Sequence, residues 1–430
     1  MALALGVYVL LSAYIVWRSA ILQPYSDMFD WLLRYYRLEV DGDLVGYLLA
    51  PHNFHRLVWT LGVLALDIRW FGAESYFFLA SSSACLAATA ALLAREAVRA
   101  AAPGLRLVAG AFAAMLTLIS INLLAAGLPI HATYLHALLF AVLAVVVAEP
   151  TGDGPVPVGR RLATLACVAA ACFGNAVGLA LWPALLWGAL RAGAGRRWTL
   201  GLAMAGALFI WLYALGQPSP GGGTLAGAQG WRTTALLVLN FLGQPWSRAL
   251  PGLGWVVGLV LLALALAALP FKGGKDAPRP ERVATQLILF SLGAAAMAAV
   301  GRSPSDQPWM VSVRYATLLT PLHLGLLILA CPYLARLRDR RAGLVDTAAA
   351  VVAILMIVHQ SASGLLVIRA ADVDRAMIAD FRAGHRDEAM RATIYPDLDH
   401  AAAVSARLRR DGRYQGEWHL PADPAGAPRL

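Results

Sequence analysis

Long hydrophobic stretches recur along nearly the whole chain and are separated by short polar segments. Two clear examples are residues 107–124 and 132–148. A run of this kind forms a helix that crosses most or all of the roughly 30 Å hydrocarbon core of a bilayer. The alternation over about ten residues that a transmembrane β-barrel requires does not occur in the sequence. The pattern therefore predicts an all-α, polytopic membrane protein.

These runs predict about eleven transmembrane helices. The segment 162–190 is counted as two, because about thirty helical residues cannot make two full crossings and Phe173-Gly174-Asn175 interrupts them. We expect this hairpin to stop partway through the membrane. The interrupted apolar stretch 233–250 is expected to be an interfacial or re-entrant helix. The other expected spans are 2–20, 74–94, 107–126, 131–148, 199–215, 252–271, 283–300, 314–332 and 344–366.

The composition agrees with this class of protein. Of the 430 residues, 59% are hydrophobic and 14% are charged, whereas a soluble domain is about 25% charged. A net charge of +10 would suggest nucleic-acid binding in a soluble protein, but here the basic residues lie in short loops between apolar runs. We therefore expect no nucleic-acid partner. The four cysteines lack the spacing of a disulfide framework or a zinc site.

The basic loops set the expected orientation. If they are cytoplasmic, the N-terminus lies inside, and the loops 21–73, 216–250 and 301–313 share the outer face. The chain then divides into a transmembrane domain, 1–366, and a polar tail, 367–430, that we expect to pack over the outer face. The basic clusters are Arg95 with Arg99, Arg160 with Arg161, Arg191 with Arg196 and Arg197, Lys272–Arg282, and Arg336–Arg341.

Two carboxylates follow the first expected span. Asp27 and Asp30 lie three residues apart, so on a helix they share one face. Ionisable groups at a membrane boundary are costly and usually mark a site. A carboxylate there can act as a general base toward an acceptor hydroxyl. A solvated acidic pair, or a helix cap led by Ser26, explains the same residues, and both interpretations stay open.

A second polar group in the first outer loop contains His52, Asn53, His55 and Arg56, directly after Pro51. Proline suits the first turn of a helix, so we expect His52, His55 and Arg56 on one helical face. The helix N-terminus and Arg56 would together form an anion site. Interfacial anchoring and ordinary capping are the alternatives. The spacing of the two histidines is also compatible with metal binding, but no metal site is predicted.

A third polar group lies in the last outer loop and at the start of the next span. Arg302, Arg314 and Tyr315 belong to it. An arginine at the outer end of a span runs against the positive-inside rule unless it is paired. A lipid phosphate or pyrophosphate is a natural partner for its guanidinium fork, and an ion pair with Asp306 is the alternative. Three other polar residues, each taken singly, are expected to pack or to cap helices: His131, His136 and Asn175.

These motifs resemble those of the GT-C superfamily, multi-span glycosyltransferases that use polyprenyl-phosphate-linked sugars and carry a catalytic aspartate after the first span. Asp27 matches that position. More narrowly, the chain resembles a bacterial group with an acidic cluster, a His-Asn-Glu-His-Arg motif and a Ser-Arg-Tyr motif. Phe54 stands where that group has glutamate, and Val313 separates the serine from the arginine. The matching segments are Ser26-Asp27-Met28-Phe29-Asp30, Pro51-His52-Asn53-Phe54-His55-Arg56, Ser312-Val313-Arg314-Tyr315 and Ile394-Tyr395-Pro396-Asp397.

The resemblance implies a hexosyl- or pentosyltransferase at the outer face of a bacterial inner membrane. It would move a sugar from a polyprenyl-phosphate donor to a surface glycan, a lipid or a pilin-like protein, among membrane lipids and without a cofactor. Two alternatives stay open: a transporter of lipid or solute with broken helices, and a glycan ligase or polymerase that uses a lipid-pyrophosphate donor. The implied catalytic residues are Asp27, Asp30 and His55, and the implied substrate-binding residues are His52, Asn53, Arg56, Arg302, Arg314 and Tyr315.

Overall fold

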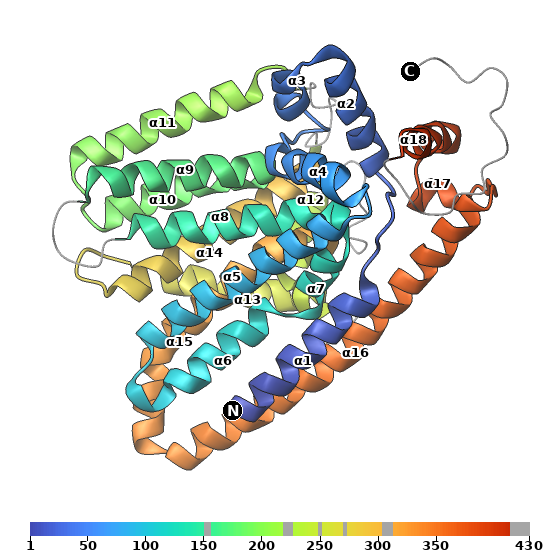
Figure 1. Ribbon diagram of the computed structural model, residues 1–430. Helices are drawn as coiled ribbons and strands as arrows, with labels where there is room; N and C mark the ends of the chain where they lie inside the picture. Colours follow the sequence, from blue (N-terminus) through green and yellow to red (C-terminus); the bar gives the residue numbers. More distant parts are fainter. Residues whose placement is uncertain (150–155, 218–226, 248–251, 270–272, 303–312, 413–430) are drawn as a thin grey trace.

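The computed structural model describes residues 1–149, 156–217, 227–247, 252–269, 273–302 and 313–412 (Figure 1). Within these residues the regular structure is helical, which confirms the all-α prediction. Short 3₁₀ helices are η1 (Pro103–Leu105), η2 (Pro129–His131), η3 (Ala176–Ala180) and η5 (Val313–Leu319). The α-helices are α1 (Ala2–Ser19), α2 (Met28–Asp41), α3 (Leu44–Leu49), α4 (Val58–Phe71), α5 (Tyr76–Ala100), α6 (Arg106–Thr117), α7 (Ser120–Gly127), α8 (Ala132–Ala148), α9 (Val158–Gly174), α10 (Leu181–Arg191), α11 (Arg196–Ala214), α12 (Gly227–Ser247), α13 (Gly254–Ala268), α14 (Arg279–Arg302), α15 (Thr320–Arg340), α16 (Ala342–Arg382), α17 (Met390–Thr393) and α18 (Leu398–Arg410).

Among the described residues, seven helices are long and apolar enough to cross a membrane. A bent pair, Pro103–Thr117 with Ser120–Gly127 at an angle of 49°, makes an eighth if it counts as one span. Ala176–Arg191 and Gly254–Ala268 are apolar but shorter. A multi-pass membrane protein is therefore indicated, while the count of eleven stays a prediction. The seven are α1, α5, Pro129–Ala148, α11, α14, Arg314–Arg340 and α16.

The long helices connect two opposite ends of the bundle. α8 begins after His131 and ends before Glu149, and α14 begins at Arg279 and ends at Arg302. Arg279 Nε donates a hydrogen bond to the carbonyl oxygen of Glu149 at 3.1 Å, so the end of α8 lies beside the start of α14. We call the end that holds His131 and Arg302 the site end, and the end that holds Glu149 and Arg279 the network end.

The hairpin expected at 162–190 is formed by α9 and α10 with η3 between them. Asn175 lies at the break, and its side-chain oxygen caps η3 by accepting a 3.1 Å hydrogen bond from the Val177 N–H. The Thr133 hydroxyl, in the first turn of α8, donates to the Gly174 carbonyl. The tip of the hairpin therefore lies at the site end, and the expected stop partway through the membrane stays a prediction.

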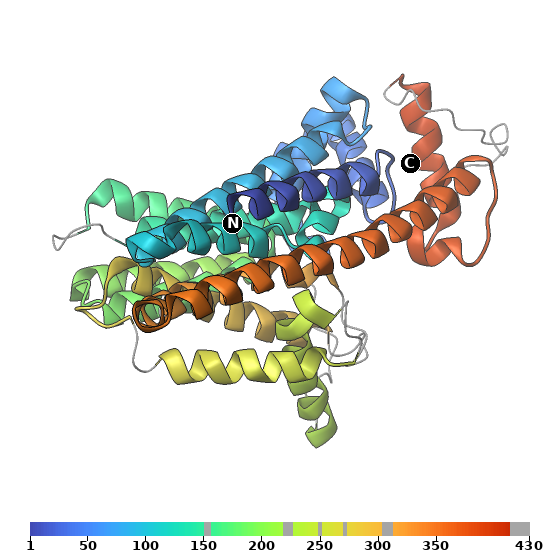
Figure 2. The same cartoon turned by 90° about the horizontal axis from the view of Figure 1, so that it is seen from below.

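α16 is a single helix of 41 residues that runs alongside α1 (Figures 1 and 2). Gln360 of α16, which is fully buried, donates from Nε2 to the Ser12 hydroxyl of α1 at 3.0 Å. Such a contact satisfies polar groups that face apolar surroundings. The helix continues through residue 366, where the sequence suggested the boundary between the transmembrane domain and the tail.

The segment after α16 folds back onto the first loop of the chain (Figure 2). The N–H of Ser26 donates to the carbonyl oxygen of Ile394 at 2.5 Å. The Phe29 ring, which is fully buried, packs edge-on against Phe381 and Tyr395 with centroid distances of 6.3 and 5.8 Å. The two ends of the chain therefore share one hydrophobic cluster beside Asp27.

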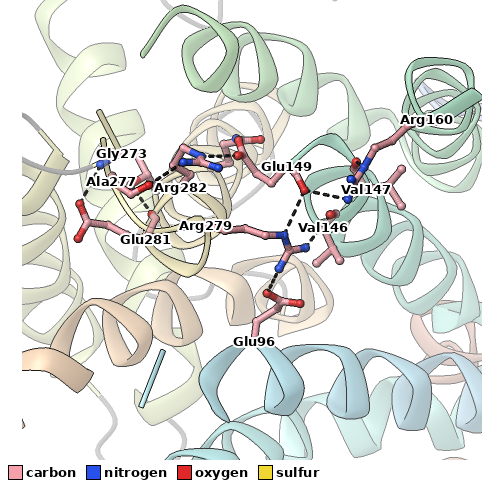
Figure 3. Close-up of polar contacts among 12 residues, drawn as sticks. Glu96, Val146, Val147, Glu149, Arg160, Gly273, Ala277, Arg279, Glu281 and Arg282 are labelled. Carbon is pink, nitrogen blue, oxygen red and sulfur yellow. Dashed lines mark hydrogen bonds and ion pairs between the residues drawn. The ribbon is translucent and has the colours of Figure 1, made fainter. Parts of the chain in front are cut away.

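Buried ion pairs hold the network end together (Figure 3). Arg279 of α14 binds the Glu96 carboxylate of α5 and donates from Nη2 to the Val146 carbonyl of α8 at 2.9 Å. Arg282 Nε donates to the Glu149 carboxylate at 2.6 Å. The Glu96 side chain is 0% exposed, so its charge has only protein groups to neutralise it. These pairs join α5, α8 and α14.

Candidate functional site

Asp27 precedes the first residue of α2 and is placed by the backbone before it. Ser26 has a positive φ of 55°, and its N–H is tied to Ile394. The Asp27 carboxylate makes no capping hydrogen bond to α2. It faces His52 instead, with 3.4 Å between Asp27 Oδ2 and His52 Nε2, and its side chain is 37% exposed. At that distance the contact is electrostatic, because it is longer than an ordinary hydrogen bond.

The two histidines lie in a tight turn before α4. The His52 N–H donates to the His55 carbonyl at 2.8 Å, and the His55 N–H donates to the His52 carbonyl at 2.9 Å. Asn53 takes a φ of 53°, a left-handed conformation that asparagine tolerates. The expected helix from Pro51 to Arg56 is therefore wrong: α4 begins only at Val58.

The turn is held against α2 by two side chains. Arg34 donates to the carbonyl oxygens of Ala50 at 2.9 Å and of Pro51 at 2.5 Å. The His52 ring packs edge-on against Trp31 with a centroid distance of 6.0 Å. These contacts replace the helical hydrogen bonds that the sequence suggested, and they aim His52 at Asp27.

Asp27 is ionised at neutral pH. The pKa of its carboxyl is lowered from the ordinary value, first by His52, while burial acts in the opposite direction. Arg314 and His131 add further lowering. The charge of Arg314, nearly three hundred residues away in the chain, therefore acts on Asp27. His131, expected to be a packing or capping residue, belongs to the same electrostatic environment.

His55 is neutral. Burial, aided by His52, Arg314 and Arg302, lowers its pKa to about 4. Its Nδ1 accepts a 3.3 Å hydrogen bond from the N–H of Ala176 at the tip of the α9–α10 hairpin. Since Nδ1 is an acceptor, the proton of the neutral ring lies on Nε2. His55 therefore links the turn to the hairpin.

Arg302 and Arg314 come from the far half of the chain. Arg302 is the last residue of α14, and Arg314 is the second residue of η5. Tyr315 is 7% exposed, and its ring packs edge-on against Tyr134 and Phe241 at 5.4 and 5.6 Å. The two arginines thus contribute charge to the site end, whereas Tyr315 contributes packing. Three residues of this motif lie outside the described residues: Asp306, Trp309 and Ser312.

Arg56 is bound by the protein itself. Its guanidinium donates to the carbonyl oxygens of Leu49, Tyr213 and Leu215, and it lies 5.7 Å from the centre of the Tyr213 ring. These carbonyls are at the ends of α3 and α11, where helices have unsatisfied acceptors. Arg56 therefore ties the histidine turn to α11, and its role in binding substrate stays a prediction.

Tyr25 belongs to the site but was missed by the sequence reading. It is 5% exposed, and its hydroxyl has no hydrogen-bond partner within the described residues. Its pKa is raised by burial, then by Asp374 and Asp27, while Arg314 acts in the opposite direction. The hydroxyl is thus a buried donor close to the same charges. Its position one residue before Ser26-Asp27 was the only available signal.

Asp30 has a different partner from Asp27. The Tyr395 hydroxyl donates to Asp30 Oδ1 at 2.5 Å. Asp30 therefore fastens the tail segment to α2, and its expected catalytic role stays a prediction. Within the described part of the chain, no group of three His, Cys, Asp or Glu side chains is arranged to hold a metal ion.

Tyr395→Phe is expected to loosen the tail. The variant loses the hydrogen bond to the Asp30 carboxylate, which is worth about 1–2 kcal/mol. Hydrogen exchange should become faster in α17 and α18 and stay unchanged in α5. Tyr14→Phe is the matched control, because Tyr14 is 46% exposed on α1. Unchanged exchange in the tail of the Tyr395 variant would refute this role.

The site end therefore brings together an ionised carboxylate, a neutral histidine, a buried phenol and two arginine charges. Of the residues singled out from the sequence, Asp27, His52, His55, Arg302 and Arg314 are linked by geometry or by electrostatics. Asn53 shapes the turn between the histidines. No protein-family model, curated protein or solved structure matches this chain, so a function has to be argued from these side chains.

Proposed function

We propose that the chain is a GT-C-type glycosyltransferase that moves a hexose or pentose from a polyprenyl-phosphate donor to an acceptor at the membrane surface. The observation that carries this proposal is the accessible Asp27 carboxylate, 3.4 Å from His52 and within the field of Arg314, at one end of an apolar bundle. A base for a hydroxyl and a cationic seat for a phosphate are the two groups that the reaction needs. The motif resemblance supports the same reaction class.

In this mechanism the acceptor hydroxyl gives its proton to Asp27 and attacks the anomeric carbon of the donor. The new carbon–oxygen bond forms as the bond between that carbon and the lipid phosphate breaks, with inversion. The phosphate leaves with the bonding electron pair, and Arg314 and Arg302 offset its negative charge. The neutral His55 can donate a hydrogen bond from Nε2 without adding positive charge.

His52 orients the base and keeps it ionised. A carboxylate with a lowered pKa is a weaker base, but it stays charged over a wider pH range. The side chain at position 54 takes no part in this arrangement, because Phe54 lies at the tip of the turn and is 45% exposed. Asp27 therefore serves as base without the glutamate found in the group that the motif resembles.

Donor turnover tests the proposal directly. The purified chain, reconstituted in nanodiscs, is incubated with polyprenyl-phosphate hexoses and pentoses and with glycan, lipid and protein acceptors. We expect one donor to be consumed, with release of polyprenyl phosphate measured by chromatography. A second experiment places the chain in sealed vesicles. Movement of an unchanged donor across their bilayer would favour a transporter instead.

His52→Gln is expected to shift the acidic limb of the pH–rate profile to higher pH. His52 is the main cause of the lowered pKa of Asp27, so its removal raises that pKa. The variant then loses the ionised base at a pH where the wild type still has it. The measurement is the initial rate of donor consumption between pH 3 and pH 8. A lower rate with an unmoved acidic limb would show that His52 does not tune Asp27.

A further inference from the structure

A cavity of about 560 Å³ lies at the network end of the bundle. Its walls come from the end of α8, the turn between α10 and α11, the start of α11 and the start of α14. Arg282 in this wall and Arg302 at the site end are twenty residues apart on α14, about 30 Å along the helix. No step of the proposed mechanism uses this cavity.

The cavity lies where three apolar helices end. Ala148 is the last residue of α8, Trp198 is in the first turn of α11, and Gln286 is in the second turn of α14. All three helices belong to segments that are long and apolar enough to cross a membrane. Such helices end where the hydrocarbon core meets the headgroups, and tryptophan is common at that level. The cavity is therefore at headgroup depth.

The walls of the cavity change from polar to apolar. Lys275 and Asp276 belong to the loop before α14, whereas Leu185 and Leu202 each lie six residues inside the ends of α10 and α11. The turn between these two helices, residues 192–195, is Ala-Gly-Ala-Gly and adds no bulky side chain. A ligand with a polar head and an apolar body fits this order of groups. A small soluble anion has no part to place against the leucines.

The charges that line the cavity leave a cation available. Glu149 is neutralised within the wall, because Arg282 Nε donates to its carboxylate at 2.6 Å (Figure 3). The remaining lining charges among the described residues are Asp276 and Lys275. Lys275 is exposed and forms no ion pair or hydrogen bond with the part of the chain that the structure describes. Its ammonium can therefore bind a ligand.

Further cations surround Trp198 in the cavity wall. The Arg161 guanidinium stacks on Trp198, with 5.4 Å from its central carbon to the ring centre. Its Nε is buried and has no hydrogen-bond partner within the described residues. Arg196 and Arg197 begin α11 and are exposed. Together with Lys275 these cations outnumber Asp276, so the region attracts an anion.

Gln286 adds a buried hydrogen-bond acceptor to the wall. It is 1% exposed, and its Nε2 donates to the Glu149 carboxylate. The side chain is held across Gly188 of α10, where a Cβ would collide with it. Its Oε1 has no donor within the described residues. Buried amide oxygens normally have a partner, and a hydroxyl on the ligand can provide one.

We propose that this cavity binds an anionic phospholipid whose headgroup carries a hydroxyl, as the glycerol headgroup of phosphatidylglycerol does. Lys275 and Arg161 bind the phosphodiester, and Gln286 Oε1 accepts a hydrogen bond from the headgroup hydroxyl. The first carbons of the acyl chains pack against Leu185 and Leu202. Basic pockets between transmembrane helices bind anionic headgroups through the same attraction. This site does not depend on the proposed transfer reaction.

Native mass spectrometry of the delipidated full chain in detergent tests this proposal. The lipid probes are phosphatidylglycerol, phosphatidylethanolamine, phosphatidylcholine and phosphatidylmethanol, which has the charge of phosphatidylglycerol but no headgroup hydroxyl. Glycerol 3-phosphate is the soluble anion. We expect phosphatidylglycerol to have the lowest dissociation constant and glycerol phosphate not to bind. Lys275→Gln and Arg161→Gln should each weaken phosphatidylglycerol binding about fivefold, the contribution of one basic residue near a lipid surface.

Arg340→Gln is the matched control. It removes an exposed arginine at the end of α15 that does not line the cavity, and it should leave binding unchanged. Lys275 is exposed, so its variant should unfold at the wild-type temperature.

Several outcomes would overturn the proposal. They are equal binding of phosphatidylglycerol and phosphatidylcholine, tighter binding of phosphatidylethanolamine, and the same affinity in Lys275→Gln as in Arg340→Gln. Equal binding of phosphatidylglycerol and phosphatidylmethanol would contradict the hydroxyl contact to Gln286. Displacement of the lipid by glycerol phosphate would identify a soluble anion as the ligand.

Discussion

Replacing Asp27 with asparagine is expected to lower the rate of sugar transfer by about 10²- to 10⁴-fold, the usual contribution of a general base. Asparagine has nearly the same shape but cannot take a proton from the acceptor hydroxyl. The fold should survive, because the carboxylate makes no capping bond to α2 and its side chain is 37% exposed. Initial rates of polyprenyl-phosphate release, compared at equal amounts of monodisperse protein, provide the measurement.

Asp30→Asn is the matched control for this loss. The Asp30 carboxylate lies three residues after Asp27 in the sequence. It accepts a hydrogen bond from Tyr395, whereas His52 pairs with Asp27. The proposed mechanism gives the proton transfer to Asp27 and no step to Asp30, so we expect transfer to continue in this variant, with faster hydrogen exchange in α17 and α18. Normal transfer by the Asp27 variant would exclude Asp27 as the base. Equal loss in both variants would assign the chemistry to the pair.

Arg279→Ala is expected to destabilise the bundle by about 3–5 kcal/mol, because it removes the buried partner of a buried carboxylate and leaves only partly exposed arginines beside it. Glu96 is 0% exposed, and Arg279 connects it to α14 and to the carbonyls of Val146 and Glu149 at the end of α8. Arg99 and Arg95 also pair with Glu96, at 2.8 and 3.4 Å, but their side chains are 44% and 49% exposed and do not reach the carbonyls at the end of α8. The measurement is thermal unfolding in detergent, followed by size-exclusion chromatography.

Two other variants make this prediction specific. Glu96→Gln combined with Arg279→Met removes both charges and should recover most of the lost stability. Arg338→Ala breaks an exposed ion pair, since Arg338 and Asp346 are 33% and 51% exposed, and should lower stability far less than Arg279→Ala does. If Arg279→Ala unfolds no earlier than Arg338→Ala, the network is not what holds α5, α8 and α14 together.

Much of the fold follows from the lengths of the apolar runs, because a chain in lipid must satisfy its backbone within helices. The break at Asn175 was also predictable, because Phe173-Gly174-Asn175 interrupts an apolar run that is too short for two full crossings. The histidine turn was not, since Pro51 is compatible with a helix start and only Arg34 and the paired backbone bonds decide otherwise.

Site residues that are close together in the sequence could be predicted from the local pattern. Contacts between residues far apart in the sequence could not. Asp27 and the two histidines are close in sequence, and the basic loops suggested that Arg314 shares their end of the bundle. The contact between Arg56 and Tyr213 and the bond from Tyr395 to Asp30 join segments far apart in the chain. Such pairs depend on tertiary packing, which a single sequence does not reveal.

The role proposed for Asp27 is the transfer of a sugar to an acceptor at the membrane surface. Mass spectrometry of surface glycans and of polyprenyl-phosphate sugars should be compared in cells that lack the protein, in cells complemented with the wild type, and in cells complemented with Asp27→Asn. We expect that cells without the protein and cells with the variant both lose one sugar from a glycan and accumulate its lipid-linked donor, and that the wild type restores both. Identical glycans and donors in all three strains would contradict it.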